Sequence, residues 1–128
     1  MGTILDYLKE YGDYSFVEKP FSDVDSLVLC QFAYLKFDGL APGPMEKCEP
    51  VSVQELAQHE DYDHLYADER YRKDNTALFQ RICKSRRFGD MRVWNYVNQI
   101  EPDQETQFSA VVCGLSEGIV YVAFRGTD

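Results

Sequence analysis

The stretch that decides the fold is EGIVYVAFRGTD, Glu117–Asp128, at the end of the sequence. Six apolar residues, Ile119–Phe124, run without a break, and the polar tetrapeptide RGTD follows them. An apolar run of this length without alternation is typical of a strand buried on both faces. We therefore expect an interior strand that leads into a functional loop.

Two further strands are expected before this one. MRVWNYVNQI, Met91–Ile100, and TQFSAVVCGL, Thr106–Leu115, are rich in β-branched and aromatic residues. The short turn SEG, Ser116–Gly118, contains a glycine, so the second and third strands are predicted to form an antiparallel hairpin. An interior strand needs a neighbour on each side, and three strands are too few to supply them. We therefore expect this chain to be the front of a larger sheet, a fragment that ends directly after its third strand.

The residues before Gly89 are predicted to be mainly helical. The signals are apolar stripes at helical spacing, residues that cap helix N-termini, and glycines that end helices. The expected helices are Thr3–Tyr11, a second one from Ser22 to about Phe37, a short one from Ser52 to about His59, and a fourth that Asn75 caps.

Two details of these helices carry further expectations. Between Leu27 and Leu35 the second helix has only Gln31 as a polar residue, so it is expected to be covered on most sides. Three cations in the fourth helix's last turn, Lys84, Arg86 and Arg87, suit the negative end of the helix dipole.

Composition excludes several classes of protein. The chain is 45% hydrophobic and 14% aromatic, which allows a packed core, and its net charge of −9 argues against a general nucleic-acid binder. No apolar run is long enough to cross a bilayer, and the N-terminus lacks the pattern of a secretory signal. The scattered cysteines Cys30, Cys48, Cys83 and Cys113 fit neither a zinc site nor a disulfide framework. We expect a cytoplasmic protein without an integral membrane segment.

Three further motifs could form functional sites, but a purely structural explanation is favoured for each. A metal site could be formed by His59, Asp63 and His64. A solvent-exposed acidic turn explains HEDYDH better, because the two histidines do not share a helical face. A phosphate-binding site at KSRRF, Lys84–Phe88, is disfavoured, because the C-terminus of a helix repels anions. A Cys–His nucleophile pair is disfavoured because the cysteines lie in apolar stripes. We expect no metal and no cofactor.

The segment YVAFRGTD resembles the F-R-G-[ST] segment of class 3 lipases, and DSLVLCQFAYLKF is similar to their N-terminal helix. The chain thus looks like the front third of an uncharacterised bacterial family of lipase class 3-like α/β-hydrolases. The resemblance implies an α/β fold in which this chain is the N-terminal portion of an α/β-hydrolase. It implies a helical segment over residues 1–89, then three strands over residues 90–128 that end at the oxyanion loop.

The resemblance also implies a role for the residues after the last strand. Gly126 would make the tight turn, Thr127 would hold the oxyanion, and Arg125 would support the strand end as an ion-pair partner. The implied substrate is a small-molecule or lipid-like ester or thioester. No G-x-S-x-G occurs, so nucleophile and triad are missing and the chain alone is expected to be inactive.

Two alternatives to a hydrolase fragment stay open. The long helical segment exceeds what a hydrolase sheet requires, which fits a non-catalytic regulatory or protein-interaction module. A small α+β domain that folds independently, without catalytic relatives, is the other alternative. The oligomeric state does not follow from the sequence.

Overall fold

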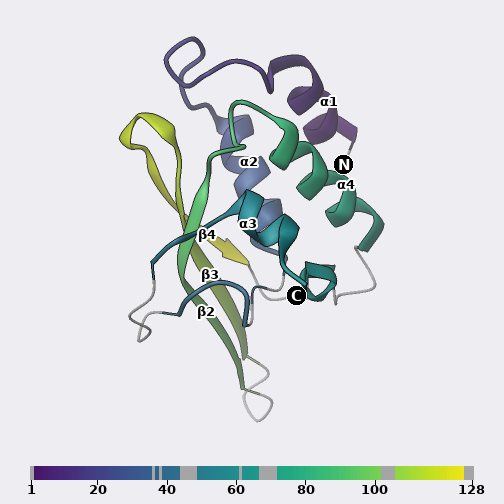
Figure 1. Ribbon diagram of the computed structural model, residues 1–128, viewed down its shortest axis with the longest axis vertical. Coiled ribbons are helices and arrows are strands. Elements are labelled where there is room, and N and C mark those ends of the chain that lie inside the picture. Colours follow the sequence, from purple (N-terminus) through teal and green to yellow (C-terminus); the bar gives the residue numbers. More distant parts are fainter. Residues whose placement is uncertain are drawn as a thin grey trace.

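The computed structural model describes residues 2–35, 37, 39–43, 49–60, 62–66, 72–101 and 106–125. Within these ranges a layer of helices lies on one side of an antiparallel sheet (Figure 1). The helices are α1 Gly2–Tyr11, α2 Asp23–Phe32, α3 Val53–Gln58 and α4 Arg72–Lys84, with 3-10 turns η1 Tyr62–Tyr66 and η4 Ser116–Gly118. The strands are β1 Val51–Ser52, β2 Arg92–Glu101, β3 Thr106–Gly114 and β4 Val120–Arg125.

The sheet is antiparallel throughout, in the order β1-β2-β3-β4. The predicted hairpin is confirmed: η4 joins β3 to β4, and Gly118 supplies the positive φ of 74° that the turn needs. A bulge interrupts the β2–β3 pairing between Trp94 and Val97, where Asn95 takes a φ of 52°. The fold class is therefore mixed helix and sheet; these elements by themselves do not define an α/β-hydrolase fold.

The core lies between the helices and the inner face of the sheet. Alternate strand residues such as Val93, Val111 and Ala123 point into it and are fully buried or nearly so. The helices contribute apolar stripes, which is why the helical spacing of the sequence was informative. The side chains packed there from α2 and α4 include Val28, Leu29, Phe32, Leu78, Phe79 and Ile82.

The local helix signals had mixed success. The capping box at Ser52 is confirmed, because its hydroxyl accepts a bond from the Glu55 N–H at 3.1 Å. The second helix ends at Phe32, earlier than expected. In the stretch from Leu27 to Leu35 only Leu27 is exposed, whereas the apolar residues Val28, Leu29, Phe32, Ala33 and Leu35 are buried, so the prediction that this stretch is covered on most sides is confirmed. Asn75 does not cap α4, which begins at Arg72. Asn75 is instead buried and accepts a bond from Gln31 Nε2 at 3.1 Å.

Arg87 corrects the expectation that it serves the dipole of α4. Its side chain is completely buried and donates two hydrogen bonds to Asp25, from Nε to Oδ1 at 2.8 Å and from Nη2 to Oδ2 at 2.7 Å. The guanidinium also lies 4.0 Å from the centre of the Phe16 ring. Its remaining N–H groups donate to backbone carbonyls of the α1–α2 connection, at Tyr14, Ser15, Lys19 and Pro20. One side chain therefore fastens the loop over residues 14–20 to α2 and to the end of α4.

Asp25 is the other half of this buried pair. Beyond the two bonds from Arg87, its carboxylate accepts bonds from the Tyr7 hydroxyl at 2.9 Å and from the N–H and hydroxyl of Ser22. Burial raises the pKa of Asp25, but the bonds from Arg87, Ser22 and Tyr7 outweigh burial and hold that pKa below its ordinary value. Asp25 is thus ionised and fully paired inside the helical layer.

Candidate functional site

The site residues predicted from the sequence are those at and after the carboxyl end of β4. Arg125 is the last residue of β4 and lies opposite Ser109 of β3, while Gly126 and Thr127 lie outside the described residues. The oxyanion role of Thr127 and the ion-pair role of Arg125 therefore stay predictions. Ser109 is buried, and its hydroxyl has no hydrogen-bond partner among the described residues.

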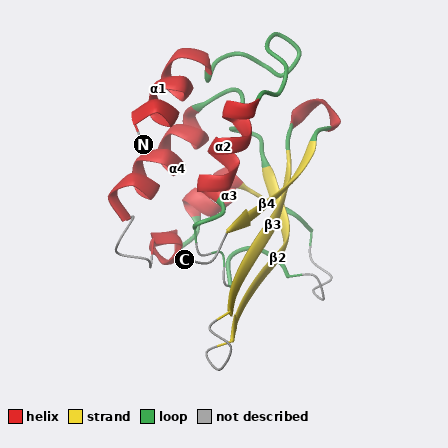
Figure 2. Ribbon diagram, turned by 180° about the vertical axis from the view of Figure 1, so that it is seen from behind, coloured by secondary structure: helices red, strands yellow, loops and turns green. Residues whose placement is uncertain are grey.

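One face of β4 is exposed, which the sequence did not predict. Val120, Val122 and Phe124 are 61%, 45% and 54% exposed, whereas Ala123 between them is completely buried. The strand therefore has one buried and one open face, and the prediction that it is buried on both faces was wrong. The reason is architectural: the helical layer covers only the inner face of the sheet (Figure 2).

Helix α2 holds the inner face of β4. The Tyr121 hydroxyl forms a hydrogen bond with the Ser26 hydroxyl and approaches Cys30 Sγ at 3.7 Å. The Tyr121 ring also packs against Phe21, with 5.6 Å between ring centres. These contacts fix the rotation of β4, so the residues on either side of Tyr121 must point outward.

The open face continues from β4 onto its neighbours. Val112 pairs with Val122 on one side and with Trp94 on the other, and all three lie on this face. Trp94 packs so closely over Gly114 that a Cβ atom built on Gly114 would lie 2.8 Å from Trp94 Cζ3. The outer face is thus an apolar surface that runs across three strands.

The long edge of β4 completes this candidate site. In the sheet of the described residues, β4 pairs with β3 alone, so its other edge has no strand beside it. Alternate residues of an antiparallel strand direct their N–H and C=O groups to opposite edges. An open edge beside exposed apolar side chains is a surface onto which another extended chain can pair.

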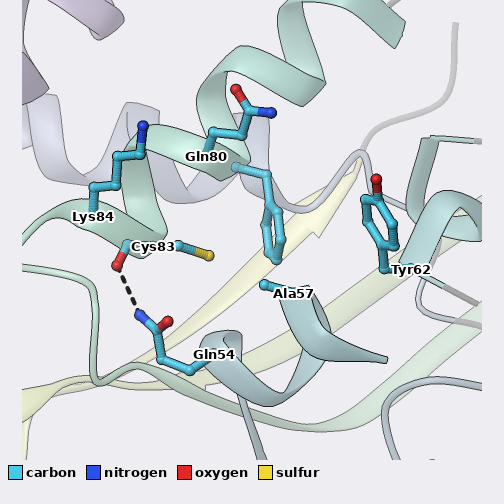
Figure 3. Close-up of a pocket in the computed structure, with 7 residues that line it drawn as sticks. Gln54, Ala57, Tyr62, Gln80, Cys83 and Lys84 are labelled. Atoms are coloured by element: carbon cyan, nitrogen blue, oxygen red, sulfur yellow. Dashed lines mark hydrogen bonds between the residues drawn. The ribbon is translucent and has the colours of Figure 1, made fainter. Parts of the chain in front are cut away.

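A hollow between α3, η1 and α4 is the second candidate (Figure 3). It encloses about 400 Å³, and the side-chain amide of Gln54 borders it while donating to the carbonyls of Cys83 and Gly89 at 2.7 and 3.1 Å. The lining residues are Gln54, Ala57, Tyr62, Phe79, Gln80, Cys83 and Lys84. Its lining combines apolar side chains with polar ones, a combination found in small-molecule sites of this size.

The cysteine thiols near these surfaces are poor candidates for nucleophilic catalysis. Burial raises the pKa of Cys83, in the hollow, to about 11 and that of Cys113, in the core, to about 12. Both thiols are protonated at neutral pH and therefore poor nucleophiles, as the apolar setting of the cysteines predicted. Cys30, Cys83 and Cys113 are free thiols, and no cluster of three or more potential metal ligands occurs in the described ranges.

The comparisons with known proteins correct the predicted family. The family model that matches is described as Mbeg1-like and covers residues 82–128, from the end of α4 through β2, β3 and β4. Nothing indicates a lipase class 3-like family, so that resemblance was wrong, and the hydrolase, lipase and esterase assignments that rested on it lose their support. No curated protein and no solved structure matches the chain.

The part of the chain similar to the Mbeg1-like family contains the three long strands of the sheet but not β1. It includes β2, β3 and β4, and with them the open face and the open edge. It also includes Arg87, whereas Asp25 lies outside it. No helix among the described residues is long and apolar enough to cross a membrane.

Proposed function

We propose that this chain is a non-catalytic protein-interaction module, in which β4 accepts an extended segment of a partner protein as an added strand. The observation that carries the proposal is the exposure of Val120, Val122 and Phe124 on a strand that pairs on one side only among the described residues. In strand addition the backbone bonds supply affinity, and alternate side chains supply specificity.

The chemistry of β4 defines the segment that fits. From Val120 to Phe124 the strand has no Asp, Glu, Lys or Arg, although the chain as a whole has a net charge of −9. A partner segment therefore needs apolar residues at every second position, so that they continue the stripe of β4 on the outer face. Positive residues at its ends would be attracted by the acidic chain.

A binding assay with a designed peptide tests this proposal. The probe is a fluorescent eight-residue peptide in which valine alternates with threonine between lysine ends, and fluorescence anisotropy reports binding. The peptide is expected to bind, and Val122→Lys is expected to weaken binding by about tenfold or more, since burying a valine contributes roughly 1.5–3 kcal/mol. A peptide with proline at its central positions should not bind, because it lacks N–H groups for pairing.

The matched control is Val17→Lys. Val17 is 70% exposed in the α1–α2 connection and belongs to no strand, so this variant adds the same charge without changing a residue of β4. Equal weakening in both variants, or equal binding of the proline peptide, contradicts strand addition. Light scattering on the same samples measures self-association; a dimer that Val122→Lys dissociates would make a second copy the occupant and would contradict the proposal as stated.

A further inference from the structure

A second hollow lies between α1 and α4. These two helices lie on the side of the helical layer remote from the sheet (Figures 1 and 2). It encloses about 190 Å³. Leu5 and Ala77 supply an apolar floor, and Gln80 supplies an amide; the remaining lining residues are Lys9, Arg81 and Lys84. No acidic residue among those that the structure describes lines it, although the chain has 22 acidic residues against 13 Lys and Arg.

The three cations have no ion-pair partner among the described residues. The described pairs use other cations, Arg86 with Glu18 and Arg87 with Asp25. Lys9 lies in the last turn of α1, and Arg81 and Lys84 lie in the last turn of α4. Positive charge therefore gathers from two helices around one small hollow.

The negative ends of the two helix dipoles offset part of this positive charge, so the sizes of the two have to be compared. The two helices end together, because the Arg87 N–H donates to the Gly12 carbonyl at 2.9 Å just beyond both C-termini. Each C-terminus carries a partial charge of about −0.5, so the two together offset about one of the three positive charges. The helix dipoles therefore do not cancel the positive charge of the residues that line the hollow.

We propose that this hollow binds a small phosphate monoester. The Arg81 guanidinium can donate two parallel bonds to phosphate oxygens, and the ammonium groups of Lys9 and Lys84 complete the charge balance of a dianion. The apolar floor at Leu5 and Ala77 suits the carbon portion of the ester. The volume lies below the roughly 300–1,000 Å³ typical of sites for drug-sized ligands, so the ester must be small.

NMR titration of the ¹⁵N-labelled full chain tests this proposal. The probes are sn-glycerol 3-phosphate and inorganic phosphate, with glycerol as the control without charge. Saturable shifts are expected at residues of α1 and α4 that line the hollow, with glycerol 3-phosphate binding more tightly than phosphate. No saturable shift with either phosphate compound overturns the site, and phosphate binding as tightly as the ester overturns the assignment to a monoester.

Charge-neutralising variants sharpen the test. Arg81→Gln and Lys84→Gln should each weaken binding of glycerol 3-phosphate about tenfold, the loss expected for one charge-assisted hydrogen bond. Arg81→Lys should also weaken it, because lysine keeps the charge but loses the planar fork. The matched control is Lys73→Gln, an exposed cation on the same helix outside the hollow. If Lys73→Gln weakens binding as much as the lining variants, the effect is general charge and the site is overturned.

Discussion

The helical layer and the outer face of the sheet differ in how completely their side chains and backbone groups are paired or buried. Where α1, α2 and the residues after α4 meet, even a buried charge pair is fully satisfied, with Arg87 making bonds to Asp25 and to four backbone carbonyls. On β4, by contrast, apolar side chains stand in water and one backbone edge is unpaired by the described residues. The comparison teaches that burial in the helical layer goes with complete pairing of polar groups, whereas the outer face of β4 keeps apolar side chains exposed.

The largest effect is expected from removing Arg87. Arg87→Ala leaves Asp25 as an unpaired charge in the helical layer, so the free energy of unfolding should fall by about 3–5 kcal/mol. Urea denaturation measures it. Arg86→Ala is the matched control: Arg86 pairs with Glu18 at the surface, and its loss should change the free energy of unfolding by less than about 1 kcal/mol. Similar losses in both variants would show that burial of Arg87 does not matter.

The next effect is a dependence of stability on acid. The folded-state pKa of Asp25 is depressed, so its contribution is complete above the ordinary aspartate pKa of about 3.9 and is lost as pH falls through the lower folded value. The free energy of unfolding should therefore decline below about pH 4. Asp25→Asn, although less stable overall, should decline less steeply over the same range. Parallel curves for the two proteins would refute a paired, ionised Asp25.

A smaller effect is expected inside the sheet. Gly114→Ala places a methyl group against the Trp94 ring and should destabilise the protein by about 1–3 kcal/mol. Trp94→Leu, combined with Gly114→Ala, should recover part of that loss, because the smaller side chain gives room to the methyl group. Thermal unfolding of the single and double variants measures the coupling. Strictly additive losses would mean that Trp94 and Gly114 do not meet.

The smallest effect on stability is expected at the open face. Val122→Lys changes an exposed residue and should alter the free energy of unfolding by no more than about 0.5 kcal/mol, while it weakens the proposed strand addition by about tenfold or more. Its buried neighbour provides the contrast, because Ala123→Lys would force a charge into the core and should prevent stable folding. Severe destabilisation by Val122→Lys would place β4 in the core and remove the difference between the two regions.

Much of the secondary structure was predictable because its signals are local. The capping box at Ser52, the glycine turn at Gly118 and the three long strands follow from residues close to one another in sequence. The exposed face of β4 was not predictable, because all six residues from Ile119 to Phe124 are apolar and apolar residues give no sign of which side water reaches. Only the position of the helical layer decides which face of β4 is exposed.

The sites were harder to predict because they depend on distant residues. Asp25 lies three residues after Ser22, which bonds to it, but its main partner, Arg87, lies 62 residues further along the chain. Lys9 and Arg81 meet only because α1 and α4 pack side by side. Thr127, the residue on which the oxyanion prediction depended, lies outside the described residues, so that prediction is untested.

Amide hydrogen exchange along β4, with and without the valine–threonine peptide, tests the central claim most directly. In the free chain, amides of alternate β4 residues should exchange slowly where they pair with β3 and quickly where they face the open edge. Saturating peptide should protect the fast amides and leave those of α1 and α4 unchanged. Uniform protection of β4 in the free chain, or fast amides that stay fast with peptide, would contradict a strand that is open for a partner.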